Sequence, residues 1–482
     1  MKQKFRFRRT TMLMIACTGF LIGLGFSRTG IKLSVEWLLI LLPLTVALFR
    51  KRSLISALTV LLTLFVLGTF RGQSFIIRTN KYDQLNQRKV TIIAYVENDA
   101  EYNDKKQLSF DVSKIDVKEP IEAQLVGRIK VSGFGENAVF KGDKLVIKGK
   151  LYETRGSRQA SIGYAELNTI SRSDNTIDIV RRNFAAGISN VLPDPQAPFG
   201  LGLLIGQRTT LDENTTKILG LVGLTHIIAV SGYNLTIIIR FVHRLFSKRS
   251  RYQTVLFSSL IIGLFLMMTG FSASIVRAAI VCGFSLLAWY YGRKFRPLLL
   301  LLLTACITAG WYPIYIWSDI GWYLSFLAFF GVLILAPLIS NKLFKKEPKA
   351  ITSVFIETFS AQLMTLPLIL YIFHQTSLIS LFSNVLTVPF VPFAMIFTLI
   401  AGIAGMINAA WLYIFALPAK FLLTYILDIS GLLSRIPNTL ISQNISAGIL
   451  MWSYGLICIL TLVLWHRLRG KRDIITEKNI FS

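Results

Sequence analysis

Residues 225–234 combine a histidine, a serine, a glycine and an asparagine within an apolar run of membrane-spanning length. Polar side chains at that depth usually mark a substrate or ion pathway. Ser231 and Gly232 also interrupt the helix, and this frees backbone groups that lipid cannot satisfy and that must face protein or water. We therefore interpret His226, Ser231, Gly232 and Asn234 as part of the wall of a pore or cavity.

A later apolar run contains an arginine. Arg277 follows a break of small residues that ends at Ser274. An arginine inside a membrane needs a partner or water, and its fork of donors suits a phosphate backbone that moves through a channel. The alternatives are an ion pair with an acid such as Asp319 or Glu357, or snorkelling of the side chain to the membrane surface.

Gln362 and Asn384 are uncharged polar residues within or beside apolar runs. Their amides can hydrogen-bond bases or a nucleic-acid backbone, but Asn and Gln also join helices in bilayers. Residues 377–386, followed by Pro389 and Pro392, are short and broken. They fit a re-entrant segment that is packed within protein.

A hydrolase is a further interpretation, because residues 229–232 differ by one position from the G-x-S-G sequence of intramembrane serine proteases. His374 would then act as the base, and it would have to lie within hydrogen-bond reach of Ser231. Nothing in the sequence indicates that proximity. We expect no enzymatic activity.

Composition places the chain in a membrane. Of 482 residues, 53% are hydrophobic and only 16% are charged, which exceeds the apolar content of soluble proteins. The formal net charge of +27 is partly topological, because Lys and Arg are retained on the cytoplasmic side. The remainder suits an anionic substrate or anionic lipid headgroups. The four cysteines have no metal-site or redox-pair spacing and are interpreted as core residues, and no cofactor or metal is predicted.

The apolar runs predict a polytopic α-helical membrane protein of about 12 spans with broken or re-entrant helices. Residues 1–70 contain three spans, which are predicted at 11–26, 33–49 and 54–70. Residues 176–215 read as an amphipathic, interfacial segment, residues 216–466 as the channel domain and residues 467–482 as a cytoplasmic tail. Basic clusters in alternate loops predict that both termini are cytoplasmic.

Residues 71–175 change to the period of β-strands, with about five strands separated by turn residues. Because they follow three spans, we expect them on the extracytoplasmic side. A small β-barrel, similar to an oligonucleotide-binding (OB) fold, is the simplest arrangement. Its strands contain many Lys and Arg but few regularly spaced aromatics, so a nucleic-acid-binding barrel and a β domain without a ligand both remain open.

Seven short motifs occur in an order that resembles ComEC-type competence proteins, the inner-membrane channels for transforming DNA. The family's T-x-H-L-x-A-x-S-G element is matched at residues 225–232, and its S-x-x-R-A element at 274–278. Its G-x-x-L-S-F element includes Trp322 and Ser325. The remaining matches are at residues 203–206, 365–367, 373–375 and 384–389.

The resemblance implies a channel that translocates single-stranded DNA into the cytoplasm during natural transformation. It also implies membrane lipids, an external DNA receptor and a cytoplasmic ATP-driven translocase as partners, since this sequence has no Gly-rich nucleotide-binding loop. The candidates for the DNA path are His226, Ser231, Gly232, Asn234, Ser274, Arg277, Trp322, Ser325, Gln362 and Asn384.

Two features depart from the family pattern. Asn234 stands where the family often has histidine, so this side chain can hydrogen-bond but cannot carry charge. Many members also continue into a metallo-β-lactamase-like domain, whereas this chain ends at Ser482 and its four histidines are too far apart for such a cluster. We therefore expect any nuclease to be a separate protein.

A secondary transporter or a polymer or lipid exporter is the alternative to a DNA channel, because broken helices near midspan also build transporter sites. No inverted repeat is visible in the sequence. The predicted β domain favours the nucleic-acid channel, since a carrier of small solutes has no evident need of it.

Overall fold

The computed structural model describes residues 6–31, 34, 36–49, 51–103, 105–136, 138–154, 156–207, 211–228, 232–246, 250–293, 296–344, 346, 348–407, 410–437 and 439–468. The chain divides into two compact units. Unit 1 comprises Met1–Arg172 and Arg296–Tyr323, and unit 2 comprises Ser173–Phe295 and Leu324–Ser482. A short segment from the middle of the sequence therefore folds with the N-terminal part.

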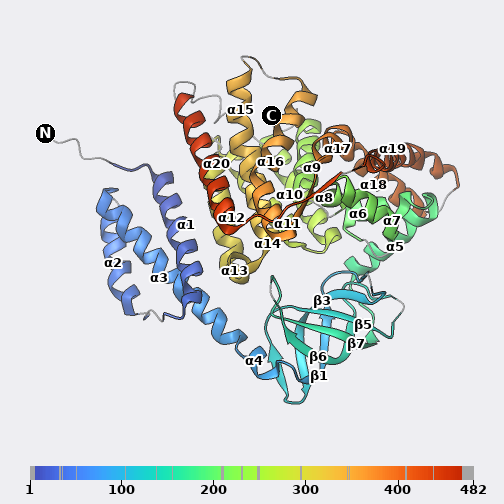
Figure 1. The fold of residues 1–482 in the computed structure, drawn as a ribbon, viewed down its shortest axis with the longest axis horizontal. Coiled ribbons are helices and arrows are strands. Elements are labelled where there is room, and N and C mark those ends of the chain that lie inside the picture. The colour runs from blue at the N-terminus through green and yellow to red at the C-terminus, as the bar shows by residue number, and fades with distance from the viewer. Residues whose placement is uncertain are drawn as a thin grey trace. The chain divides into compact units, whose positions relative to one another are not determined.

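Unit 1 contains helices and a β-sheet (Figure 1). Its helices are α1 (Arg9–Phe26), α2 (Glu36–Phe49), α3 (Leu54–Thr79), α4 (Lys81–Leu85), α12 (Pro297–Trp311) and α13 (Ile314–Ser318), with a 3-10 turn at Ser27–Thr29. Its strands are β1 (Lys89–Val96), β2 (Glu101–Tyr102), β3 (Leu108–Glu119), β4 (Ala123–Leu125), β5 (Ile129–Phe134), β6 (Lys144–Glu153) and β7 (Ala160–Ser171).

Helices α1, α3 and α12 begin at the same end of unit 1. The backbone nitrogen of Phe7 donates to the carbonyl oxygen of Arg52 at 2.9 Å, just before α1 and α3 begin. The guanidinium of Arg296, directly before α12, donates to the hydroxyl of Thr10 in the first turn of α1. Basic residues thus gather at this end of the three helices.

The opposite end of α12 is capped by a side chain of α3. Arg71 Nε donates to the carbonyl oxygen of Gly310 at 2.9 Å. A second guanidinium nitrogen of Arg71 donates to the carbonyl oxygen of Trp311 at 3.0 Å. These carbonyls have no partner within the helix, and a cation there is also favoured by the helix dipole.

The strands form one mixed sheet in the order β1-β6-β7-β5-β3-β2, with β4 beside β3 and an additional pairing of β1 with β3. All pairs are antiparallel except β5 with β7, which is parallel. Alternate residues of β1, β3, β5, β6 and β7 enclose an aliphatic core around Phe110, in the pattern expected for half-buried strands. The predicted β domain is confirmed as this seven-stranded mixed sheet, whereas the finer prediction of a five-stranded OB-like barrel is not confirmed.

The sheet is attached to the segment around α13. The side-chain amide of Gln159 donates to the hydroxyl of Tyr312 at 2.6 Å, and Ser318 Oγ donates to the carbonyl oxygen of Gly156 at 2.5 Å. The guanidinium of Arg128 lies over the Tyr312 ring, 5.7 Å from its centroid. These bonds explain why Arg296–Tyr323 belongs to unit 1.

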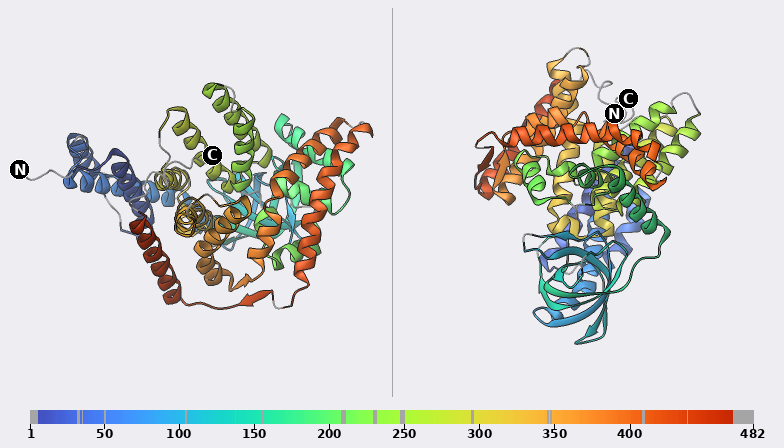
Figure 2. Two further views of the ribbon diagram at one scale, coloured as in Figure 1. Left: turned by 90° about the horizontal axis from the view of Figure 1, so that it is seen from above. Right: turned by 90° about the vertical axis from the view of Figure 1, so that its right-hand side faces the viewer.

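Unit 2 is helical, apart from one short pair of strands. Its elements are α5 (Thr176–Val191), α6 (Gln196–Ile205), α7 (Glu213–Leu221), α8 (Thr225–Ile228), α9 (Gly232–Leu245), α10 (Arg251–Thr269), α11 (Ala273–Tyr290), α15 (Ala336–Leu343), α16 (Ala350–Phe373), β8 (Gln375–Ser377), α17 (Ser380–Thr387), α18 (Val391–Ile407), a 3-10 segment (Ala410–Ala416), α19 (Leu417–Ser434), β9 (Leu440–Ser442) and α20 (Ala447–Arg467). Helix α14 (Ile320–Phe330) begins in unit 1 and continues through a π-helical turn at Gly331–Leu335 into α15. Strand β9 pairs with β8 and lies in the connection between α19 and α20 (Figure 2).

The predicted count of about twelve spans is not confirmed. Within the described residues, eight helices are long and apolar enough to cross a membrane, or nine if α17 and α18, bent by 52°, form one broken span. Three further apolar helices, α2, α6 and α12, are shorter. The apolar run around residues 225–234, predicted to be of membrane-spanning length, does not continue α7 as one helix, because α7 ends at Leu221 and α8 begins at Thr225. Hydropathy measures the length of an apolar run and not the length of straight helix within it. A count of spans from hydropathy therefore includes short and broken helices.

Candidate functional site

The structure describes α8 as far as Ile228 and α9 from Gly232, so the helix break predicted at Ser231 and Gly232 falls partly outside the described residues. Ser231 lies outside the described residues. The side chain of His226 is exposed, and its Nδ1 lies 3.0 Å from the carbonyl oxygen of Gly223. His226 thus belongs to α8 and Asn234 to α9.

Gly232 lies against α11 at the second predicted motif. A Cβ at this position would lie 2.6 Å from Cβ of Ala278 and 3.6 Å from the carbonyl oxygen of Ser274. One turn further, Thr236 Oγ1 lies 3.8 Å from Cys282 Sγ, so α9 and α11 run in the same direction. Small residues at positions four apart permit this close approach of two helices. The structure thus brings together two motifs that are about 40 residues apart in the sequence.

Asn234 and Arg277 are both buried, with 2% and 3% of their surface exposed. Asn234 lies two residues beyond Gly232 on α9, and Arg277 precedes Ala278 on α11. They are therefore on the two helices that meet at Gly232. At this burial the guanidinium of Arg277 lies inside the helix bundle, and its predicted role as a phosphate guide stays a prediction.

Two further predicted residues, His226 and Gln362, lie where the turn after α7 packs on α17. A Cβ at Gly223 would lie 2.4 Å from Cβ of Ser380, whose hydroxyl accepts a hydrogen bond from the amide of Gln362 on α16. Ser383 Oγ donates to the carbonyl oxygen of Val222 at 2.6 Å. We call Val222, Gly223, His226, Gln362, Ser380 and Ser383 the serine junction.

Asn384 lies next to the serine junction on α17. It is 5% exposed, and no group in the described part of the chain hydrogen-bonds to its Oδ1. Its backbone carbonyl accepts from Val388 at the bend into α18. A buried amide oxygen without a protein partner costs free energy, so its presence needs another explanation.

Trp322 and Ser325 lie on the same helix, α14, but in different units. Trp322 belongs to unit 1, where its indole Nε1 donates to Thr308 Oγ1 at 3.1 Å and its backbone nitrogen to Asp319 Oδ1 at 3.2 Å. The indole bond joins the first turn of α14, which lies in unit 1, to α12. Ser325 is half-buried in unit 2.

The β domain has a surface that the motifs did not indicate. The outward sides of β1 and β6 contain Lys89, Tyr95, Lys144, Lys148, Lys150 and Tyr152, which we call the lysine face. Lys144 and Lys114 Nζ lie 5.8 and 5.6 Å from the ring centroid of Tyr95, and Lys150 Nζ lies 5.4 Å from that of Tyr152. The alternation of these residues along each strand can be seen in the sequence. The register that aligns β1 with β6 cannot.

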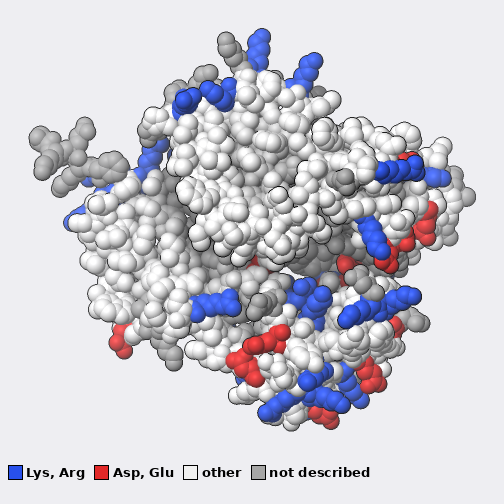
Figure 3. Space-filling view, viewed as in Figure 1, with Lys and Arg blue, Asp and Glu red and all other residues white. Residues whose placement is uncertain are grey.

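The four lysines of this face are free of ion pairs within the described residues, unlike Lys118, which pairs with Glu122 at 3.3 Å. Over the β domain, Lys and Arg are interspersed with Asp and Glu, whereas the helical surface in view is largely uncharged (Figure 3). Unpaired cations beside exposed tyrosines are suited to an anionic ligand that also has rings to stack.

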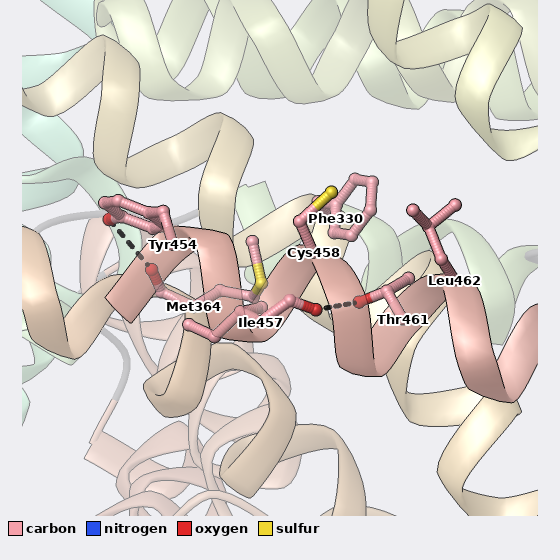
Figure 4. Close-up of a pocket in the computed structure, with 7 residues that line it drawn as sticks. All are labelled: Phe330, Met364, Tyr454, Ile457, Cys458, Thr461 and Leu462. Atoms are coloured by element: carbon pink, nitrogen blue, oxygen red, sulfur yellow. Dashed lines mark hydrogen bonds between the residues drawn. The ribbon is translucent and has the colours of Figure 1, made fainter. Parts of the chain in front are cut away.

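A cavity of about 270 Å³ lies between α14, α16 and α20 (Figure 4). It is lined by Phe330, Met364, Tyr454, Ile457, Cys458, Thr461 and Leu462. Tyr454 donates its hydroxyl to the carbonyl oxygen of Met364, and Thr461 donates to that of Ile457, so both polar groups are already used. The cavity is apolar and contains none of the predicted site residues.

Among the described residues, no group of three or more His, Cys, Asp or Glu side chains could hold a metal ion. The expected lack of enzymatic activity is not tested by this result and stays a prediction.

One comparison with known protein families matches the part of the chain that contains the α9–α11 contact and the serine junction. A model of the family described as "Competence protein" matches residues 203–467. The ComE operon protein 3 of Bacillus subtilis (strain 168) is 25% identical over 226 residues, which are 46% of this chain and 28% of the relative. The chain thus matches less than a third of that protein's length. No solved structure matches.

Proposed function

Because the chain belongs to the competence protein family, we propose that this membrane protein takes part in DNA uptake and conducts a single strand into the cytoplasm during natural transformation. The family match carries the proposal, since it covers the broken helices and every polar residue of unit 2 that we assign to the path, from His226 to Asn384. The candidate spans supply the membrane setting.

The orientation proposed for the chain places the β domain outside the cell. Helices α1, α3 and α12 all begin at an end of unit 1 that contains Arg8, Arg9, Arg52 and Arg296, and the sheet follows the opposite end of α3. Basic residues are retained in the cytoplasm, so the N-terminus is cytoplasmic in this proposal. The C-terminus is cytoplasmic too, because His466 and Arg467 lie at the end of α20.

An OB-like arrangement of the sheet is supported by its pairings. Strand β1 pairs with both β6 and β3, and β6-β7-β5-β3 are joined in sequence, so these five strands each have two neighbours. Such a sheet presents strands and loops to single-stranded nucleic acid. In the proposal, the lysine face contacts the incoming strand through its phosphates and, at Tyr95 and Tyr152, through its bases.

Neutralising the lysine face is expected to weaken DNA binding. A Lys144→Gln, Lys148→Gln, Lys150→Gln triple variant loses three cations, so the slope of log Kobs against log salt for a single-stranded oligonucleotide should fall by about 2. The measurement is a salt titration of oligonucleotide binding to the full chain in nanodiscs. Fewer phosphate contacts lower both the affinity and its dependence on salt.

A matched pair of single variants controls this prediction. Lys148→Gln removes an unpaired lysine, whereas Lys118→Gln removes one from the same domain that is paired with Glu122. Lys148→Gln should lower the salt slope and Lys118→Gln should leave it nearly unchanged. If the triple variant bound DNA with the original affinity and slope, the lysine face would not be a DNA contact.

The side-chain amide of Asn384 is expected to contribute to DNA uptake and not to the stability of the fold. Asn384→Ala removes no protein hydrogen bond at Oδ1, so the free energy of unfolding should change by no more than about 1 kcal/mol while uptake per folded molecule falls. The neighbouring Ser383→Ala should cost about 1 kcal/mol, because it breaks the bond to Val222, and leave uptake per folded molecule unchanged. Normal uptake by Asn384→Ala would remove this residue from the path.

The decisive experiment is uptake of labelled DNA into cells that lack the gene, with and without the gene restored, with entry scored separately from surface binding. The proposal expects loss of entry with retained binding to a separate receptor, and recovery on restoration. It also requires a cytoplasmic ATP-driven translocase and leaves strand degradation to a separate nuclease. Unchanged entry in the deletion, with failed export of another polymer, would favour a transporter or exporter instead.

A further inference from the structure

Two of the four cysteines come together in unit 1. Cys17 lies in the middle of α1 and Cys306 in α12, 289 residues later in the sequence. Cys306 Sγ donates a hydrogen bond to the carbonyl oxygen of Cys17 at 3.2 Å. The spacing of the cysteines in the sequence had indicated no redox pair.

The helix pair that contains the thiols is held at both ends. Before the pair, Arg296 donates to Thr10. Beyond it, a Cβ at Gly310 would lie 3.3 Å from the ring of Phe20, so the helices remain in close contact for the last turn of α12. The Cys306 thiol therefore lies against the backbone of Cys17 between two anchored helices, and a disulfide requires such a close approach of the two residues.

The other two cysteines provide internal comparisons. Cys282 is buried on α11, and Cys458 is exposed on α20 beside the apolar cavity. Both belong to unit 2, on elements other than α1 and α12. A reagent that oxidises every accessible thiol should react first with the exposed Cys458. Oxidation of Cys17 and Cys306 before Cys458 is expected only if these two cysteines form a paired site.

We propose that Cys17 and Cys306 form an oxidation site within the membrane, at which a lipid-soluble quinone converts the two thiols to a disulfide linking α1 to α12. One S–S bond forms and two S–H bonds break. The two electrons and two protons pass to the quinone, which becomes the quinol. An oxidant of this class fits the site because both cysteines lie within apolar helices, which a water-soluble disulfide such as oxidised glutathione does not enter.

The disulfide would join the N-terminal helix covalently to the segment Arg296–Tyr323. That segment otherwise binds the rest of unit 1 through noncovalent contacts. The site is independent of the proposed DNA path, since it uses none of the residues assigned to that path.

The test treats membranes containing the full-length chain with decylubiquinone, whose fully substituted ring does not alkylate thiols. Denaturation, maleimide labelling and mass spectrometry then count the free thiols. We expect two labels fewer per chain, a peptide with Cys17 linked to a peptide with Cys306, and return of both labels after reduction. Cys458→Ser should preserve this loss, whereas Cys17→Ser should abolish it and leave Cys306 labelled.

If Cys17→Ser does not fold, the peptide map of the unsubstituted chain still tests the proposal. The proposal is overturned if the labels on Cys17 and Cys306 are unchanged by the quinone. It is equally overturned if the linked peptides contain Cys458 or come from two different chains.

Discussion

Replacing Gly23 by valine is expected to lower the free energy of unfolding by about 3 kcal/mol or more. A Cβ at Gly23 would lie 2.0 Å from the carbonyl oxygen of Phe65 on α3 and 2.8 Å from its carbonyl carbon. Both atoms belong to the backbone, so no side chain can rotate away and the two helices must separate. Thermal unfolding of the purified chain in detergent measures the effect.

The same helix provides a matched control. Gly25 is two residues from Gly23 on α1, and a Cβ there would meet nothing within 4 Å. Gly25→Val carries the same small penalty for a β-branched residue in a helix but no clash. Equal unfolding temperatures for Gly23→Val and Gly25→Val would show that α1 and α3 do not pack through this glycine.

The tight crossing extends along both helices. Gly19 lies against the backbone of Leu61, and Gly68 lies against the backbone of Phe20, with Cβ positions 2.5 and 2.2 Å from the respective carbonyl oxygens. In a membrane the packing of small residues replaces the hydrophobic effect as the force that joins helices. We therefore expect the loss at Gly23 to be among the largest of any single substitution in unit 1.

Gly232→Ala is expected to cost about 2 kcal/mol and to reduce uptake through loss of folded protein. Its new Cβ would lie 2.6 Å from Cβ of Ala278, closer than two carbon atoms can approach, and 3.3 Å from the ring of Phe329. The glycine of the Ser-Gly motif thus serves the contact between α9 and α11. Stability in detergent and uptake in cells are the two measurements.

A second substitution tests the cause of this loss. Ala278→Gly removes the atom that Gly232→Ala would strike, so the double variant should recover most of the stability lost by Gly232→Ala alone. Neighbours that share a contact show coupling of this kind, typically about 0.5–3 kcal/mol. Gly283→Ala on the same helix α11, where a Cβ meets nothing within 4 Å, should be nearly neutral. Additive losses in the double variant would place the clash elsewhere.

The family and the membrane class were predicted from the sequence, because both depend on local signals. The motifs at residues 203–206 and 225–232 lie inside the region that the family model matches. The amphipathic segment expected at 176–215 begins with helix α5, and the strands expected within 71–175 begin with β1. A period of 3.6 or 2 residues is imposed by the backbone itself, so such elements can be read without knowing their neighbours.

The count of about twelve spans is not confirmed, because an apolar run does not reveal where a helix bends. Helix α2 has 14 residues with Pro43 inside, and α12 has only 15. The motif that contains Trp322 did not indicate that its indole bonds to Thr308 within unit 1, and its place on the DNA path stays a prediction. A motif gives the residue type and its neighbours in sequence, but not the direction of its side chain.

The sequence by itself determined that this chain is an apolar, basic, polytopic protein of the competence family with a β domain near its N-terminus. Only the tertiary structure decided that Gly232 meets Ala278, that Gln362 bonds to Ser380, that Arg296–Tyr323 joins unit 1 and that Cys17 lies beside Cys306. Helix formation depends on residues within a few positions of one another. These contacts instead join residues separated by up to 289 positions, and they depend on which helix faces pack in three dimensions.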